Sequence, residues 1–126
     1  MADLIETFEQ LEAWKAAREL VRLLYATFRR APAAKDFGLR DQVQRASVSA
    51  MTNIAEGFER LHLGEKLQFY NVARASCGEV RSLSYVMLDA RYISGQKHQT
   101  ILALAAQTGR LISGLIRSTR ARTAKP

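Results

Sequence analysis

Apolar residues return at intervals of three and four along most of this chain, the spacing that stacks side chains on one face of an α-helix. Four such segments are predicted, at about residues 7–30, 38–61, 65–93 and 96–117. The third shows the pattern at greatest length, at Phe69, Ala73, Ser76, Val80, Leu83 and Met87. Because short links between long amphipathic helices favour antiparallel neighbours, the predicted fold class is all-α, an up-and-down antiparallel four-helix bundle.

The length and composition agree with a single bundle domain over residues 1–126. Apolar residues make up 48% of the chain, which has two prolines and one cysteine. That cysteine, Cys77, has small neighbours and is expected to be a buried apolar side chain. No stretch reaches the roughly 20 apolar residues that cross a bilayer, and the opening residues do not resemble a signal peptide. We therefore expect a cytoplasmic protein with no membrane role.

The second segment places small polar residues where a helix interior is usually apolar, at Ser47, Ser49, Thr52 and Asn53. Three explanations are open. Small side chains let two helices approach closely, or the hydroxyls bond to carbonyls one turn earlier. Alternatively, Asn53 and Glu56 form a polar cluster inside the bundle that fixes the helix register. A structural use is favoured over a ligand site, because no histidine lies near in sequence to activate a hydroxyl.

The net charge of +7 is distributed unevenly along the chain. Residues 1–89 carry equal numbers of acidic and basic side chains, and residues 90–126 contain no acidic residue. The whole excess of positive charge therefore lies in the last part of the sequence. Such an asymmetry is informative about binding partners rather than about the fold.

This excess forms a basic strip along the fourth segment and a tail, residues 118–126, that is expected to fray. The strip comprises Arg110, Arg117, Arg120, Arg122 and Lys125, with Arg91 and Lys97 as further candidates. Guanidinium groups match phosphate oxygens and release condensed counterions, so the strip predicts contact with a nucleic-acid backbone. No aromatic residue follows Tyr92, so the strip has no partner for base stacking, and sequence-specific recognition is not expected. The alternative is that the charge only keeps the protein soluble or faces an acidic protein.

Other chemistries find little support in the sequence. Glu59 and His62 have the Glu-x-x-His spacing of di-iron bundles, but the second pair that such a site needs is absent. Glu56 and Glu79 are candidates for paired carboxylates, although arginines on both segments favour structural ion pairs. No phosphate-binding loop and no catalytic triad can be assembled. We expect no enzyme activity, no metal and no cofactor.

The stretch FGLRDQVQRASVSAMTNIAEGFER, residues 37–60, resembles the signature helix of the 23S rRNA-intervening-sequence protein family, relatives of retroelement accessory variability proteins. The matching positions are Phe37, Gly38, Leu39, Gln42, Arg45, Ala46, Val48, Ser49, Asn53, Ile54, Ala55, Glu56 and Gly57. The stretches LEAWKAARELVRLLY and FYNVARASCGEVRSLSYVMLDARYI are similar to the first and third helices of the family. The likeness covers roughly residues 10–120.

Three positions depart from the family pattern. Met51 stands where a proline is frequent, which removes the reason to expect a kink there. His62 replaces a serine that could cap the third helix, and Ala75 replaces a common glycine. The resemblance implies a helical bundle that associates into a ring, often a pentamer. It also implies a gene within an rRNA insertion or beside a retroelement, and kinship with an accessory protein that works with a reverse transcriptase and nucleic acid. It implies no catalytic residues.

Together these observations predict a non-enzymatic, oligomeric bundle that binds structured RNA or an RNA/DNA hybrid electrostatically, as an accessory to a nucleic-acid machine. The alternative is a ring-forming scaffold that contacts a protein partner and no nucleic acid. The structural motif is expected at Asn53, Glu56, Gly57 and Glu79. Three aromatic residues either anchor subunit contacts or complete the monomer core, namely Trp14, Tyr70 and Tyr92.

Overall fold

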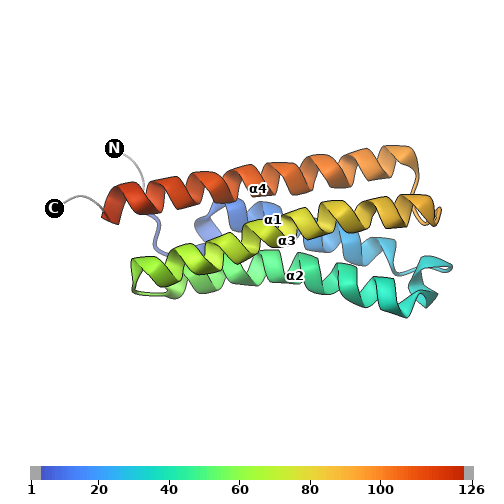
Figure 1. The fold of residues 1–126 in the computed structure, drawn as a ribbon, viewed down its shortest axis with the longest axis horizontal. Helices are drawn as coiled ribbons and strands as arrows, with labels where there is room; N and C mark the ends of the chain where they lie inside the picture. The colour runs from blue at the N-terminus through green and yellow to red at the C-terminus, as the bar shows by residue number, and fades with distance from the viewer. Residues whose placement is uncertain (1–3, 124–126) are drawn as a thin grey trace.

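Four long helices run alternately up and down along one axis (Figure 1). The computed structural model describes residues 4–123. The helices are α1 (Glu12–Thr27), α2 (Phe37–Glu59), α3 (Leu63–Asp89) and α4 (Gly95–Thr123), with short 3-10 turns η1 (Phe8–Gln10) and η2 (Ala33–Lys35). Each helix packs against the next in sequence, and α1 also packs against α4, which closes the ring of four. The predicted up-and-down bundle is confirmed.

The first helix is shorter than the predicted range of 7–30. The backbone N–H of Thr7 donates to Gln10 Oε1 at 3.1 Å, as a capping box would require, but this cap begins η1 rather than α1. At the other end, α1 stops at Thr27, five residues before Pro32. The intervening residues form the turn that reverses the chain.

Asp36 begins α2 and also ties two distant parts of the chain together. Its Oδ1 accepts from the backbone N–H of Leu39 at 3.3 Å, which satisfies one free donor of the first turn. Its Oδ2 accepts from the Tyr92 hydroxyl at 2.9 Å, and this hydrogen bond raises the pKa of Tyr92. The link between α3 and α4 is thus held against the start of α2.

The ends of α3 follow from its flanking residues. His62 at the N-cap makes no side-chain capping hydrogen bond, as its substitution for serine predicted. After α3, Arg91 adopts a left-handed backbone conformation with φ of 63°, and the Tyr92 N–H reaches back to the Met87 carbonyl. This is the closing geometry in which glycine is usual.

The predicted end of the fourth helix at residue 117 is wrong, because α4 continues to Thr123. Thr119 is buried, and its Oγ1 donates to the Leu115 carbonyl at 2.7 Å. Ser118 Oγ donates to the same carbonyl at 3.1 Å. Residues 118–123, expected to fray, are therefore anchored as part of the helix.

The core consists of two apolar clusters placed along the bundle. One cluster lies toward the α1–α2 and α3–α4 connections and is centred on Leu20, Leu24, Val43, Met87 and Ile101. The other lies toward the α2–α3 connection and includes Ala50, Ile54, Tyr70, Cys77 and Ile112. Among the described residues, no helix is both long and apolar enough to span a membrane.

Candidate functional site

A groove of about 670 Å³ lies between α3 and α4 and is hereafter called the α3–α4 groove. Its floor is formed by small residues of both helices, chiefly Cys77, Gly78, Ala105, Gly109 and Ser113. A Cβ atom built at Gly78 or Gly109 would meet nothing within 4 Å. The hollow therefore exists because short side chains leave the space between the two helices unfilled.

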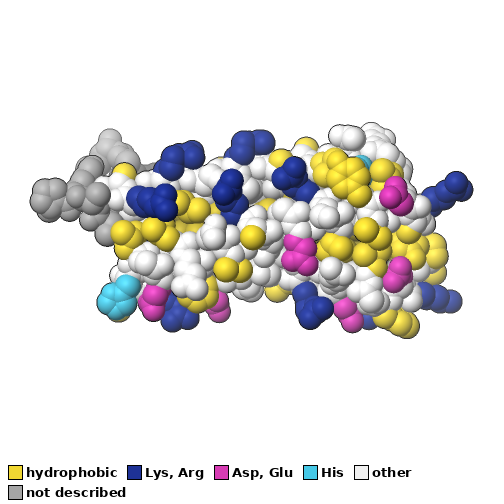
Figure 2. All heavy atoms as spheres, in the orientation of Figure 1, with side chains coloured by type: hydrophobic (Ala, Val, Ile, Leu, Met, Phe, Trp, Pro, Cys, Tyr) yellow, Lys and Arg dark blue, Asp and Glu magenta, His cyan; other side chains and the backbone are white. Residues whose placement is uncertain are grey.

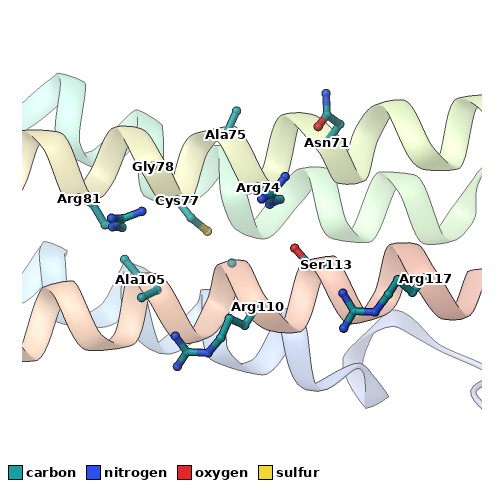
Figure 3. A pocket seen from close by; sticks show the side chains of 12 residues that line it. Asn71, Arg74, Ala75, Cys77, Gly78, Arg81, Ala105, Arg110, Ser113 and Arg117 are labelled. Carbon is teal, nitrogen blue, oxygen red and sulfur yellow. The ribbon is translucent and has the colours of Figure 1, made fainter.

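Four exposed arginines surround this floor, Arg74 and Arg81 from α3 and Arg110 and Arg117 from α4. Figure 3 shows Arg74 and Arg110 across the groove from each other, with Arg81 toward one end and Arg117 toward the other. Both pairs are seven residues apart, a spacing that returns a helical side chain to nearly the same face. Two antiparallel helices thus line one groove with positive charge.

The four arginines of the groove form no ion pair with the residues that the structure describes. Among residues 4–123, ion pairs join only Lys15 to Glu12, Arg22 to Glu19 and Arg40 to Asp41, all far from the groove in sequence. In Figure 2 several Lys and Arg side chains form a row over α3 and α4, whereas most Asp and Glu side chains lie lower on this face, where other Lys and Arg side chains accompany them. The site is suited to attract a polyanion.

Cys77 lies on the groove floor yet is buried, as the sequence predicted. Burial raises the pKa of its thiol to about 11, because the charged thiolate would lose solvation there. The thiol is therefore protonated at neutral pH and is not an activated nucleophile.

The residues of the basic strip predicted from the sequence lie at different places in the structure. Arg110 and Arg117 line the groove. Arg120 follows Arg117 by three residues on the same stripe of α4 and extends the line toward the helix end. Arg122 points elsewhere, into a smaller hollow with Lys66 and Tyr70. Lys125 lies outside the described residues.

Lys66 in that smaller hollow has a structural task. Its Nζ donates to the Phe58 carbonyl at 2.7 Å and to the Gly57 carbonyl at 3.4 Å, which satisfies acceptors at the end of α2. Burial lowers the pKa of Lys66, and the nearby positive charge of Arg122 lowers it further. The sequence analysis did not identify this residue.

Arg91 and Lys97 do not join the groove. Lys97 lies in a hollow with Arg29 and Arg30, beside the loop after α1. Since α4 rises about 1.5 Å per residue, Lys97 and Arg120 lie roughly 35 Å apart along the helix. The Arg91 backbone closes α3, and its side chain is exposed at the same end of the bundle as Lys97.

The sequence analysis missed Arg74 and Arg81. The signal was present, because their seven-residue spacing on the third helix repeats that of Arg110 and Arg117 on the fourth. Two antiparallel helices that pack side by side, each with arginines seven residues apart, can place those arginines along the same groove. Net charge along the sequence does not reveal these two arginines, because residues 1–89 contain as many acidic as basic residues.

The small polar residues of α2 form the contact with α3, hereafter the α2–α3 seam, with Ser49, Asn53 and Gly57 facing Tyr70 and Ser76. Ser49 and Ser76 hydroxyls lie 2.9 Å apart, and Asn53 Nδ2 donates to Ser49 Oγ at 3.0 Å. Ser76 donates to its own helix at the Val72 carbonyl, so it accepts from Ser49. A polar chain therefore crosses between the helices.

Two of the three explanations for these residues are confirmed. Ser47 and Thr52 hydroxyls donate to carbonyls three and four residues earlier. Close approach occurs at Gly57, where an added Cβ would lie 2.6 Å from Tyr70 Cε1. The third explanation holds only for Asn53, because Glu56 is exposed and takes no part in the polar chain.

The expected structural ion pairs of Glu56 and Glu79 are wrong. Both side chains are exposed, and neither forms an ion pair with any residue between 4 and 123. Helical exposure explains this, since water solvates a carboxylate well enough that no pairing is required. Within the same range no group of three or more His, Cys, Asp or Glu side chains gathers as a metal site would require.

The three aromatic candidates for subunit contact differ in placement. Tyr70 is 1% exposed and completes the monomer core, so it is not available as a contact between copies. Its burial raises the pKa of the phenol to about 12. Trp14 is half-buried and packs edge-on against Phe8 with ring centres 5.2 Å apart, and Tyr92 is held by Asp36.

Comparison with known proteins agrees with this fold. A crystal structure of a protein of unknown function from the S23 ribosomal protein family of Bacteroides thetaiotaomicron superposes with a TM-score of 0.75. The two are 18% identical, and the match covers 83% of this chain and 95% of the other. Comparison with curated protein sequences found no match. The family model described as 23S rRNA-intervening sequence protein matches residues 9–114. This chain therefore belongs to the 23S rRNA-intervening sequence protein family.

Proposed function

We propose that this chain is a non-catalytic binding protein that holds a nucleic-acid backbone in the α3–α4 groove. The observation that carries the proposal is the set of four exposed arginines, two from each helix, that have no acidic partner among residues 4–123. Arg120 extends the same line. Planar guanidinium groups bind phosphate oxygens through paired hydrogen bonds and release counterions from the nucleic acid.

The groove floor favours backbone recognition over base reading. Its residues are mostly Ala, Gly and Ser, which offer neither long hydrogen-bonding side chains nor aromatic rings. Contacts to phosphate position a protein without specifying sequence. If the four groove arginines each contact a phosphate, the logarithm of affinity falls with the logarithm of salt at a slope of about −4 for a duplex and about −3 for a single strand.

RNA is the first candidate among nucleic acids. The name of the family refers to sequences that intervene in 23S rRNA. An RNA/DNA hybrid is also a polyanion. The salt slope distinguishes a duplex from a single strand but does not distinguish a hybrid from an RNA duplex. We propose RNA as the ligand and treat the hybrid as a competitor in the experiment.

The test is a titration of labelled RNA against the double variant Arg74→Gln/Arg110→Gln. Loss of two phosphate contacts is expected to weaken binding by about 25- to 60-fold at 0.1 M salt and to reduce the salt slope by about 1.5. Substitution is preferable to truncation of α4, because Thr119 is buried and its removal would disturb the fold.

The matched control is Arg18→Gln/Arg45→Gln, which removes the same charge from exposed positions on α1 and α2. It is expected to bind RNA as the unaltered protein does. If both double variants lose affinity equally, binding follows net charge and the groove is not the site. If neither loses affinity, the chain does not bind RNA through these helices.

A second candidate function is a scaffold assembled from several copies. Exposed apolar side chains on α3, at Val72 and Val86, support it because they lie fourteen residues apart on one face. Light scattering on a sizing column would test it with Val72→Glu/Val86→Glu. A fall in particle mass supports assembly through α3, whereas a protein that is monomeric without substitution excludes it.

A further inference from the structure

The stripe of α3 that lines the groove does not end at the last arginine. Asn71, Arg74, Gly78 and Arg81 follow one another at intervals of three, four and three residues, and all four line the groove. The next interval of four leads to Tyr85, still within α3. Tyr85 is thus about one helical turn, or roughly 6 Å, beyond Arg81 along the line of the groove.

Tyr85 is exposed but supported from one side. The residue is 52% exposed, and its ring centre lies 4.5 Å from the ring of His98 on α4 at an angle of 73°. His98 is buried at 3% exposure and so forms a fixed support. Edge-to-face contacts of this kind hold an aromatic ring in place, which lowers the ordering cost when a ligand packs on it.

One exposed acidic residue follows this ring along α3, and the basic residues Arg91 and Lys97 lie at the same end of the bundle. Asp89 follows Tyr85 by four residues on the same side of α3 and is exposed. Figure 2 shows a hydrophobic patch beyond the right-hand end of the row of Lys and Arg side chains over α3 and α4. On α3 the arginines that line the groove end at Arg81, one helical turn before Tyr85, so a phosphate backbone held by them reaches this ring at the end of the groove.

We propose that Tyr85 is a stacking platform for an unpaired base, and that the ligand of the α3–α4 groove is therefore single-stranded. Every base has a flat face that can stack on an aromatic ring, whereas the bases of a duplex are covered by their neighbours. α4 contains no Phe, Trp or Tyr, and Tyr85 on α3 supplies an exposed ring instead. This inference rests on the proposed function of the groove.

The experiment uses the full chain and three labelled RNA probes of about 12 nucleotides, namely oligouridylate, an abasic backbone and a blunt duplex. The unaltered protein is expected to bind oligouridylate about 5- to 150-fold more tightly than the abasic backbone, the range that one stacked base gives. Tyr85→Leu is expected to remove this preference, and Tyr85→Phe is expected to keep it because the ring remains. Circular dichroism melting confirms that each variant is folded.

The matched control is Tyr25→Leu, a change at another exposed tyrosine on α1, away from the groove, and it is expected to keep the preference. Equal affinity of the unaltered protein for the abasic and oligouridylate probes overturns the platform while leaving the groove function intact. The same follows if Tyr85→Leu keeps the preference, or lowers only the particle mass, which would assign Tyr85 to a contact between copies. If no probe binds, or if Arg74→Gln/Arg110→Gln binds all probes normally, the proposed function itself fails.

Discussion

The α2–α3 seam and the α3–α4 groove are both lined by small residues on long helices, but one is closed and the other is open. In the seam, the Tyr70 ring fills the space above Gly57, and hydroxyls bond from helix to helix. In the groove, nothing lies within 4 Å of the Cβ positions of Gly78 and Gly109, and arginines stand around the gap. Small residues permit close packing only where a partner side chain enters. Where long charged residues flank them, they leave a hollow.

The largest expected effect concerns Cys77, which lies on the groove floor but belongs to the core. At pH 8 its raised pKa of about 11 leaves roughly 100-fold less thiolate than an ordinary cysteine has. Alkylation of the folded protein should therefore be at least about 100-fold slower than alkylation in urea. Equal rates would mean that the floor is open to solvent.

The same raised pKa makes a prediction about stability. The folded state keeps the Cys77 proton at pH values where the unfolded thiol has lost it. The free energy of unfolding gains this contribution fully below pH 9 and loses it as pH rises from about 9 toward about 11. A Cys77→Ser variant should lack this part of the pH dependence in urea titrations.

Gly57→Ala tests the closed region directly. The added methyl would lie 2.6 Å from Tyr70 Cε1, and the buried ring cannot move without disturbing the core. We expect the free energy of unfolding to fall by about 1–3 kcal/mol, as overpacking usually costs. Urea denaturation followed by circular dichroism measures this. An unchanged midpoint of urea denaturation would show that the α2–α3 seam accommodates a methyl group at this position.

The hydrogen bonds across the α2–α3 seam should contribute less to the free energy of unfolding than the packing of Tyr70 against Gly57. A double-mutant cycle with Ser49→Ala and Ser76→Ala isolates the hydrogen bond between the two hydroxyls, and its coupling energy is expected to be about 1 kcal/mol. Additive effects of the two substitutions would indicate that the hydroxyls serve only their own helices.

The smallest change in the free energy of unfolding, an increase rather than a decrease, is expected in the α3–α4 groove. Gly109→Ala adds a methyl group that meets no atom within 4 Å and improves helix propensity. The free energy of unfolding should rise by about 0.5–1 kcal/mol in the same urea experiment. A loss comparable to that of Gly57→Ala would remove the distinction between seam and groove.

The fold was largely readable from the sequence, because apolar spacing and short links define a bundle without any long-range information. The end of α4 was not readable in the same way. Thr119 looks like a residue of a polar tail, and only its packing against the bundle reveals that the helix continues. Tyr70 was equally ambiguous, since core and surface aromatics share the same helical spacing.

The sequence allowed two of the four arginines of the groove to be predicted. Arg110 and Arg117 were identified because no acid accompanies them in the sequence, whereas Arg74 and Arg81 were hidden by acids elsewhere in the first part of the chain. Charge counting along a sequence does not show which charges share a surface. Likewise, Arg122 was grouped with the strip by proximity in sequence, although a helix turns it toward Lys66.

The Asp36 carboxylate has a consequence for how this molecule comes apart. One oxygen organises the opening turn of α2, and the other receives a phenol from a position 56 residues away. The Asp36 carboxylate therefore holds both the start of α2 and the α3–α4 connection, at the end of the bundle that is remote from Arg122. Loosening that group would release a helix start and a connecting loop in the same event, so this end should melt as one cooperative unit.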